Sequence, residues 1–273
     1  MEHNWMKLAC WVISLNPEAE NTVKLLMSLQ KQGLSAEIFP AVDGRDAMPP
    51  LERDERLNKT LSLIRHRKLL TNSEMGCYLS HLRAVRKAYD EGYSHVCLFE
   101  DDVVIEDDFA EVLFESAKDD VELVRYMALR LRRRKTLREF VASSGVAYKL
   151  VRPERGAVGA QAYLMNRRGM KKFIDCALEI YEPVDKLFDH FWLFDLQVCG
   201  VEPHTVYELE HETSVQKVPD TKAQGPSWWQ RLLFHPVKLW FSIRRHSYMF
   251  THRRDFQPAS MPEGVQGKTR RIR

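Results

Sequence analysis

The chain has 273 residues, of which 44% are hydrophobic and 29% are charged, and its formal net charge is +3. This composition is that of a globular protein with one large core or two smaller ones, and it excludes fibrous and low-complexity proteins. No apolar run reaches the roughly 18 to 20 residues that cross a bilayer. No basic segment precedes the first apolar run, so the sequence also predicts no secretory signal. We therefore expect any membrane association to be peripheral.

The charge is unevenly distributed along the chain. Residues 225–273 hold ten Lys or Arg and two Asp or Glu, which leaves 31 basic and 36 acidic side chains in residues 1–224. The five cysteines are widely spaced and contain no C-x-x-C pair. This pattern indicates reduced thiols and predicts a cytoplasmic location.

Three elements are expected at the start of the chain. Residues 8–13 form an apolar run typical of a buried strand, residues 22–32 carry apolar side chains at helical spacing, and residues 36–39 predict a second strand. Strand, helix and strand in this order form a βαβ unit with parallel strands and a right-handed crossover. The unit has no G-x-G-x-x-G or Walker A sequence, which argues against NAD enzymes and P-loop ATPases.

A helical piece is expected near residues 57–70, and a longer helix follows it. Thr71 and Glu74 have the spacing of a capping box, so the longer helix is predicted to begin there and to end at Gly92. Ser80 and His81 lie off its apolar stripe, and each is either a structural group or a functional one.

Three consecutive acids, Glu100, Asp101 and Asp102, follow the apolar run at residues 96–99. Ligands of open α/β sheets bind beyond the carboxyl ends of the strands, and Mg²⁺ or Mn²⁺ take oxygen ligands while they bridge phosphates. The triplet therefore predicts a divalent metal site, and the alternative is a solvated acidic turn.

Arginines crowd residues 125–138, where they face either phosphates or water. Just before this stretch, the acids at residues 107–108 predict the N-terminus of a helix. Beyond it, residues 160–165 predict a strand that leads into a helix through Gly169, so the α/β alternation continues.

A further helix is predicted from Pro183 to about Leu196, with Pro183 as its first residue. Asp185 lies in its first turn and Asp189 lies one turn further on the same face. The helix is rich in aromatic residues and should be largely buried, so an acid on it is either well paired or part of a cleft. Compensation of the helix dipole is the alternative role for Asp185.

The character of the sequence changes after residue 225. Apolar residues fall on one helical stripe while cations fall elsewhere, which is typical of a helix that lies in a membrane interface. The alternative is a stripe that packs on the body or on a partner subunit. Pro236 predicts a kink, and residues 264–273 are expected to be disordered. The stripe consists of Trp229, Leu232, Leu233, Val237, Trp240 and Phe241.

Four motifs in order resemble glycosyltransferase family 25, the lipopolysaccharide-biosynthesis galactosyltransferase type to which the collagen galactosyltransferases are related. The similarity continues through residues 159–164 and 183–185. After Asn16 the family has an arginine-rich segment, whereas this chain has Pro-Glu-Ala-Glu-Asn. The four motifs are residues 12–16, 39–44, 74–81 and 98–102.

The resemblance implies a GT-A-like α/β sandwich with a central, mostly parallel sheet in residues 1–224, and residues 225–273 would add a basic amphipathic helical tail. It also implies inverting transfer of a hexose, galactose or glucose, from a UDP-sugar to a hydroxyl of a lipopolysaccharide or lipooligosaccharide core. The acceptor would be lipid-linked, the tail would contact the membrane surface, and no nucleic acid partner is expected. The enzyme would then be peripheral on the cytoplasmic face of a bacterial inner membrane.

The resemblance also assigns roles at the metal and at the acceptor. Asp102 and Glu100 would ligate Mn²⁺ or Mg²⁺, while Glu100 and Asp101 would position ribose or metal-bound water. Inversion in one displacement needs a carboxylate that takes the proton of the acceptor hydroxyl. Asp185 is the first choice for this base and Asp189 is the second.

Four further residues are expected to contact the nucleotide sugar. Ser80 and His81 match the helix motif of the family, and Asn16 and Asp43 end the first two strand segments.

Two other functions remain open from the sequence. The same acids would serve a metal-dependent phosphoryl-transfer or hydrolytic enzyme, which would release phosphate rather than UDP. If the acids form a surface loop, the aromatic and basic tail would belong to a non-catalytic protein that binds membranes or nucleic acid, and binding would survive loss of Asp102.

Overall fold

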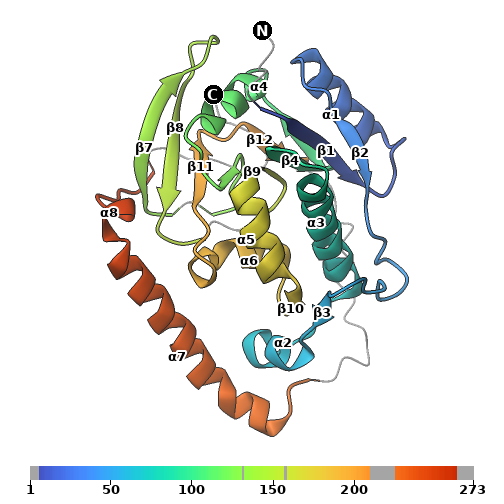
Figure 1. Cartoon of the computed structure of the whole chain (residues 1–273), viewed down its shortest axis with the longest axis vertical. Helices are drawn as coiled ribbons and strands as arrows, with labels where there is room; N and C mark the ends of the chain where they lie inside the picture. The colour runs from blue at the N-terminus through green and yellow to red at the C-terminus, as the bar shows by residue number, and fades with distance from the viewer. Residues whose placement is uncertain (1–5, 131, 157–158, 210–224, 263–273) are drawn as a thin grey trace.

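The computed structural model describes residues 6–130, 132–156, 159–209 and 225–262. In this part of the chain, an eight-stranded mixed sheet in the order β2-β1-β4-β9-β6-β11-β8-β7 has helices on both faces (Figure 1). The predicted α/β class is confirmed. The disorder expected for residues 264–273 lies outside the described residues.

The βαβ unit at the start of the chain is confirmed. It consists of β1 (Leu8–Ser14), α1 (Glu20–Lys31) and β2 (Glu37–Pro40), and the two strands are parallel. On its other side, β1 pairs in parallel with β4 (His95–Glu100). The first two motifs and the acidic motif therefore meet at one edge of the sheet.

Both faces of the central strands are buried, which explains their continuous apolar sequences. Trp11 and Leu98 point into a core beneath one set of helices, while Val12 and Phe99 point into a second core on the opposite face. The first core is covered by α3 (Asn72–Asp90), α5 (Arg167–Ala177) and α6 (Val184–Asp189), and the second by α1 and α4 (Phe109–Ala117).

The capping box that starts α3 is present. The backbone N–H of Glu74 donates to Thr71 Oγ1 at 3.1 Å, and the Thr71 N–H donates to Glu74 Oε2 at 2.8 Å. This start fixes which residues of α3 face the sheet, because side chains four positions apart share a face.

Six of the eight strands run in the same direction, and only β9 (Ala162–Asn166) and β8 (Ala147–Pro153) are reversed among the described residues. The prediction of a mostly parallel sheet is therefore confirmed. The other strands of this half are β6 (Leu123–Arg125), β11 (Val198–Glu202) and β7 (Arg134–Val141).

The arginine-rich segment contributes β7 to an antiparallel hairpin with β8, which the sequence did not predict. Arg134 is buried and its guanidinium lies 2.8 Å from Glu202, while Arg138 lies 2.8 Å from Asp119. Arg134 therefore faces a largely buried carboxylate, so neither phosphate nor water is its partner, whereas the half-buried Arg138 pairs with an acid at the surface.

The helix predicted over residues 183–196 is shorter than expected. Helix α6 ends at Asp189 and a 3-10 turn follows, because His190 leaves the helical conformation and its Nδ1 lies 2.6 Å from Glu182 Oε1. The acid at position 108 does precede α4, but its carboxylate accepts hydrogen bonds from Tyr148 and Ser144 instead of capping the helix.

Short elements complete the fold and connect its layers. They are β3 (Arg56–Leu57), α2 (Lys59–His66), β5 (Val103–Ile105), β10 (Glu179–Ile180), η1 (Phe191–Leu193), β12 (Val206–Glu208) and α8 (Arg253–Phe256).

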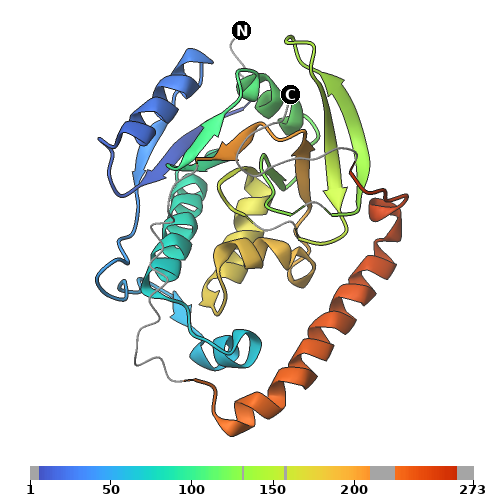
Figure 2. The ribbon, with the colours of Figure 1, turned by 180° about the vertical axis from the view of Figure 1, so that it is seen from behind.

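Helix α7 (Trp228–Thr251) runs along the outside of the molecule, from α2 at one end to α8 at the other (Figures 1 and 2). The single apolar stripe predicted for this helix is wrong. Phe241 is buried against the body, and Val237 packs on the same core, whereas Leu232 is 66% exposed. Among the described residues, no helix combines the length and the apolar character that crossing a bilayer requires.

Candidate active site

Four carboxylates meet where β4 ends and β5 begins. The antiparallel pairing of β5 with β12 sets Glu208 opposite Val103, and the Leu209 N–H donates to the Asp102 carbonyl oxygen at 2.8 Å. Burial, together with the charges of Glu100, Asp101 and Glu208, raises the pKa of Asp102 to about 7. The acids predicted from the sequence thus gain a fourth member from a distant strand.

Two polar atoms at this cluster lack partners. Asp102 Oδ1 and Gln161 Oε1 are buried, and neither has a hydrogen-bond partner in the described part of the chain. Gln161 Nε2 donates to Glu208 Oε1 at 2.7 Å, and the Gln161 backbone carbonyl oxygen accepts from the Glu100 N–H at 2.8 Å. Carboxylate and amide oxygen atoms that accept no hydrogen bond and lie among negative charges are the ligands that a hard divalent cation needs. The residues therefore fit Mg²⁺ or Mn²⁺.

The end of β1 holds the middle acid in place. Ser14 Oγ donates to Asp101 Oδ2 at 2.5 Å, and the same hydroxyl accepts from the Asn16 N–H at 3.0 Å. Asn16 is exposed next to this contact, and its side-chain oxygen accepts from the Glu18 N–H at 3.3 Å.

Helix α3 presents Cys77 and His81 to the acids. His81 Nε2 lies 3.4 Å from Glu100 Oε1 and its Nδ1 lies 3.1 Å from the Tyr163 hydroxyl, while Cys77 Sγ lies 3.9 Å from Glu100 Oε1. The ligand atoms of Cys77, His81 and Glu100 all lie within 4.8 Å of one another, a spacing at which they can hold a metal ion. His81 is buried and stacked on the Tyr163 ring.

Asp185 belongs to the same surroundings. Burial is the largest cause of the raised pKa of the Cys77 thiol, followed by the charges of Glu100, Asp185 and Asp102. Cys77 is nevertheless exposed, so solvent reaches the place where these groups meet. The pKa of Asp185 is itself raised by burial, against the charge of Lys186. A carboxylate with a raised pKa is a better proton acceptor than one in water.

Asp189 has a different environment. Its carboxylate accepts from Arg125 Nη1 at 2.9 Å, and both side chains are almost completely buried. Arg125 also donates to the Gly159 carbonyl oxygen, and any Cβ at Gly156 would clash with the Asp189 side chain. The Arg125–Asp189 pair therefore joins α6, β6 and the segment at Gly159, which makes Asp189 poorly suited to the role of second-choice base.

Ser80 and Asp43 are also engaged within the protein. The Ser80 hydroxyl is buried, accepts from the Val42 N–H at 2.7 Å and donates to the Gly76 carbonyl oxygen at 2.7 Å. Asp43 is exposed, and the hydrogen bond from Arg45 lowers its pKa to about 2. A Cβ at Gly76 would lie 2.6 Å from the Val42 carbonyl oxygen. The loop before Gly44 thus rests on α3 through Ser80 and Gly76.

The structure brings Glu100, Asp101, Asp102, His81 and Asp185 together, with Asn16 at the margin. Asp189 and Ser80 lie in buried internal contacts instead, and Asp43 is exposed and paired with Arg45. Five residues of the cluster were not predicted from the sequence. Four of them lie within the segments that resemble the family, and this position was the signal that could have identified them: Ser14, Cys77, Gln161 and Tyr163. The fifth, Glu208, lies outside these segments and has no local signal.

The sequence profile of Glycosyltransferase family 25 (LPS biosynthesis protein) matches residues 8–188. The chain belongs to this family. The matched residues include β1, α3 and β4, which supply Ser14, His81 and the acidic triplet, as well as Asp185.

Relatives of the chain include proteins named as glycosyltransferases and proteins named as inactive members of the family. The chain is 28% identical over 246 residues to "Probable inactive glycosyltransferase 25 family member 3" of Rattus norvegicus, covering 79% of this chain and 41% of that protein. It is 28% identical over 207 residues to the lacto-N-neotetraose biosynthesis glycosyltransferase LgtB of Neisseria meningitidis serogroup B, covering 70% of this chain and 72% of LgtB. The chain thus spans about two fifths of the rat protein.

A solved structure titled "Crystal Structure of A197 from STIV" is 12% identical to the chain, with a TM-score of 0.38, and covers 74% of this chain and 84% of the other. A similarity of this size supports no further argument.

Proposed function

We propose that this chain is a metal-dependent inverting glycosyltransferase with a GT-A-like catalytic domain in residues 1–224. It transfers a hexose, galactose or glucose, from a UDP-sugar to a hydroxyl of a lipopolysaccharide or lipooligosaccharide core. Membership of family 25 and the likeness to LgtB support the reaction class. The single observation that carries the mechanism is the buried, unpartnered Asp102 Oδ1 among three further acids.

Asp102 and Glu100 would hold Mn²⁺ or Mg²⁺, and Glu208 is placed to assist from β12. When bound, the ion neutralises charge on the departing diphosphate. Asp101 is oriented by Ser14, and His81 is oriented by Tyr163, so neither side chain has to be ordered when the donor arrives. Asn16 lies beside Asp101, where it would contact the nucleotide.

Asp185 would take the proton of the attacking acceptor hydroxyl. Its raised pKa has burial as its main cause, so the carboxylate becomes a stronger base at the point where the hydroxyl must be deprotonated. Because one displacement inverts the anomeric centre, a single base of this kind is sufficient. Asp189 is held by Arg125 and would position the segment that carries Asp185.

The test is UDP release from a panel of UDP-sugars, with Mn²⁺ and a detergent-solubilised lipopolysaccharide acceptor. We expect acceptor-dependent release with one donor, lost in EDTA and in Asp102→Asn. Asp107→Asn is the matched control, since Asp107 is exposed on the same segment. Release of phosphate instead of UDP would indicate a phosphoryl-transfer enzyme. Silence with every donor, from protein that is folded, would indicate an inactive family member.

A further inference from the structure

Helix α7 is held against the body by the middle of its inner face. Phe241 is buried there, and the Arg65 guanidinium of α2 lies 3.5 Å from the centre of its ring. The rings of Trp192 and His190 meet Phe241 edge-on at centroid distances of 5.6 and 5.7 Å. These contacts fix the rotation of the helix about its own axis.

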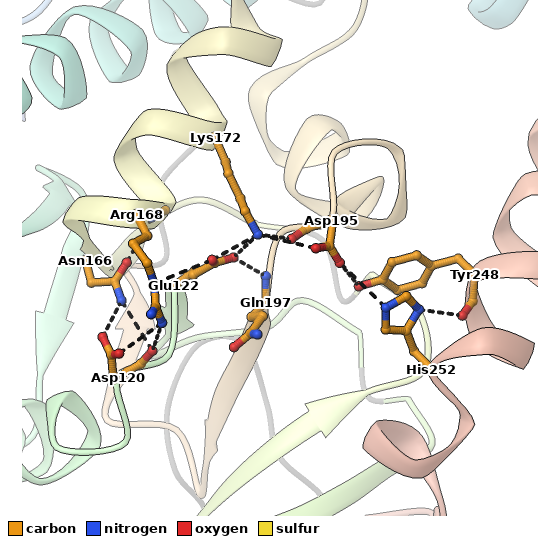
Figure 3. A network of polar contacts seen from close by, with 10 residues as sticks. Asp120, Glu122, Asn166, Arg168, Lys172, Asp195, Gln197, Tyr248 and His252 are labelled. Carbon is orange, nitrogen blue, oxygen red and sulfur yellow. Dashed lines mark hydrogen bonds and ion pairs between the residues drawn. The ribbon is translucent and has the colours of Figure 1, made fainter.

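The last turn of α7 is tied down by polar contacts (Figure 3). The Tyr248 hydroxyl donates to Asp195 Oδ1 at 2.8 Å, and Lys172 Nζ lies 3.5 Å from Asp195 Oδ2. Lys172 also lies 2.9 Å from Glu122, which is almost completely buried. Because both the middle and the end of α7 are anchored, the opposite face of the helix has one fixed direction.

That opposite face carries a row of large apolar side chains. Their spacing of four, seven, four and seven residues keeps them within one narrow sector of an α-helix. Each is more than half exposed, and together they run nearly the length of the 24-residue helix. We call this row the outer stripe, and it consists of Trp228, Leu232, Leu239, Ile243 and Phe250.

The charge around the outer stripe has a single sign. Helix α7 contains no Asp or Glu, and residues 225–262 hold six Lys or Arg against one Asp. Arg231 and Lys238 lie along one border of the stripe, and both are exposed. On that border, Lys238, Arg65 and Phe234 line a recess of about 150 Å³ between α7 and α2.

We propose that the outer stripe docks this protein on an anionic lipid bilayer, with α7 lying parallel to the surface. An apolar row would enter the interface while its flanking cations meet headgroup phosphates. A second copy of the chain is a poorer occupant, since two such faces would bring cations against cations without an acid on either helix. The inference does not rest on the proposed reaction, because binding to vesicles requires no catalysis.

The experiment is co-sedimentation of the full chain with vesicles of phosphatidylcholine, either pure or mixed with phosphatidylglycerol. We expect binding to the mixed vesicles, weakened by salt, and a blue shift of tryptophan emission. The double variant Leu239→Ser/Ile243→Ser should bind about tenfold more weakly or worse, since it removes apolar area that the bilayer would bury. The matched control is Met27→Ser/Val141→Ser, which removes equally exposed apolar residues from α1 and β7.

Circular dichroism melting of both double variants establishes that they are folded. Equal binding by Leu239→Ser/Ile243→Ser and wild type would overturn the proposal. So would binding that is lost equally in the control variant. A dimer in analytical ultracentrifugation that Leu239→Ser/Ile243→Ser dissociates, with no binding to either vesicle, would assign the stripe to a second copy and also overturn it.

Discussion

Two carboxylates that are largely withdrawn from solvent, Glu182 and Asp102, have opposite surroundings. Glu182, just before α6, accepts from His190 Nδ1 at 2.6 Å, lies 3.2 Å from His66 Nε2 and lies 3.8 Å from Arg65. Asp102 has an oxygen without a partner in the described structure, and it lies among other acids.

The pKa values follow the partners. Burial alone would raise the pKa of Glu182, but the hydrogen bonds from His190 and His66 and the charges of His190 and Arg65 lower it to about 2. Burial and like charges raise the pKa of Asp102 to about 7. A buried carboxylate with a full set of donors stabilises the fold, whereas one among like charges opposes it unless a cation binds. The contrast separates an acid whose charge the fold itself compensates from one whose charge a bound cation would compensate.

The largest expected effect is that of Asp102→Asn. Loss of a metal ligand should reduce UDP-hexose transfer by about 10³-fold, which corresponds to several kcal/mol of charge stabilisation. The apo variant should melt at a higher temperature than wild type, because the amide removes a charge that burial and three acids disfavour. Differential scanning fluorimetry with EDTA and with Mn²⁺ measures both states. A Mn²⁺-induced rise in melting temperature equal to that of wild type would contradict this assignment.

The next effect separates Asp185 from Asp189. Asp185→Asn should lower kcat by about 10²- to 10⁴-fold, the range for loss of a general base, and leave the fold intact. Asp189→Asn should instead lower the free energy of unfolding by about 3 kcal/mol, since it leaves Arg125 buried without its carboxylate. Steady-state kinetics and urea unfolding of both variants test this. The reverse pattern would make Asp189 the base.

Glu182→Gln tests whether the Glu182 carboxylate stabilises the fold. The amide cannot replace a carboxylate bonded to His66 and His190, so the free energy of unfolding should fall by about 3 kcal/mol. Urea titration at pH 7 measures the loss. Glu20→Gln is the control, since Glu20 is exposed and paired with Lys24 alone among the contacts described, and it should leave the unfolding midpoint unchanged. A midpoint of Glu182→Gln equal to that of wild type would refute the structural role.

The smallest expected effect is the pH dependence of the contribution that the Glu182 carboxylate makes to the free energy of unfolding. The folded pKa of about 2 lies below the ordinary glutamate pKa of 4.5, so Glu182 stabilises the fold above pH 4.5 and loses this contribution as the pH falls towards 2. The difference in unfolding free energy between wild type and Glu182→Gln should therefore shrink by about 2 kcal/mol between pH 7 and pH 3. A difference that stays constant over this range would show that the carboxylate is not the stabilising group.

Much of the fold could be predicted because it depends on local periodicity. The strands near residues 8–13 and 96–99, the βαβ unit and the capping box of α3 all follow from neighbouring side chains. The β7–β8 hairpin could not be predicted, because burial of Arg134 depends on Glu202 from a distant strand. The two apolar faces of α7 were predicted as one stripe for a similar reason, since its inner side is decided by distant residues such as Arg65, His190 and Trp192.

The sequence by itself determined that an acidic triplet ends a buried strand, and that the motifs of family 25 follow one another in order. It ranked Asp185 before Asp189 as the base, but it could not predict which of these two residues, one turn apart on the same helical segment, has an internal partner. Only the tertiary structure placed Arg125 on one of them and Glu208 beside the triplet. The physical reason is that burial and pairing set the properties of a carboxylate, and its partners here come from strands and helices far along the chain.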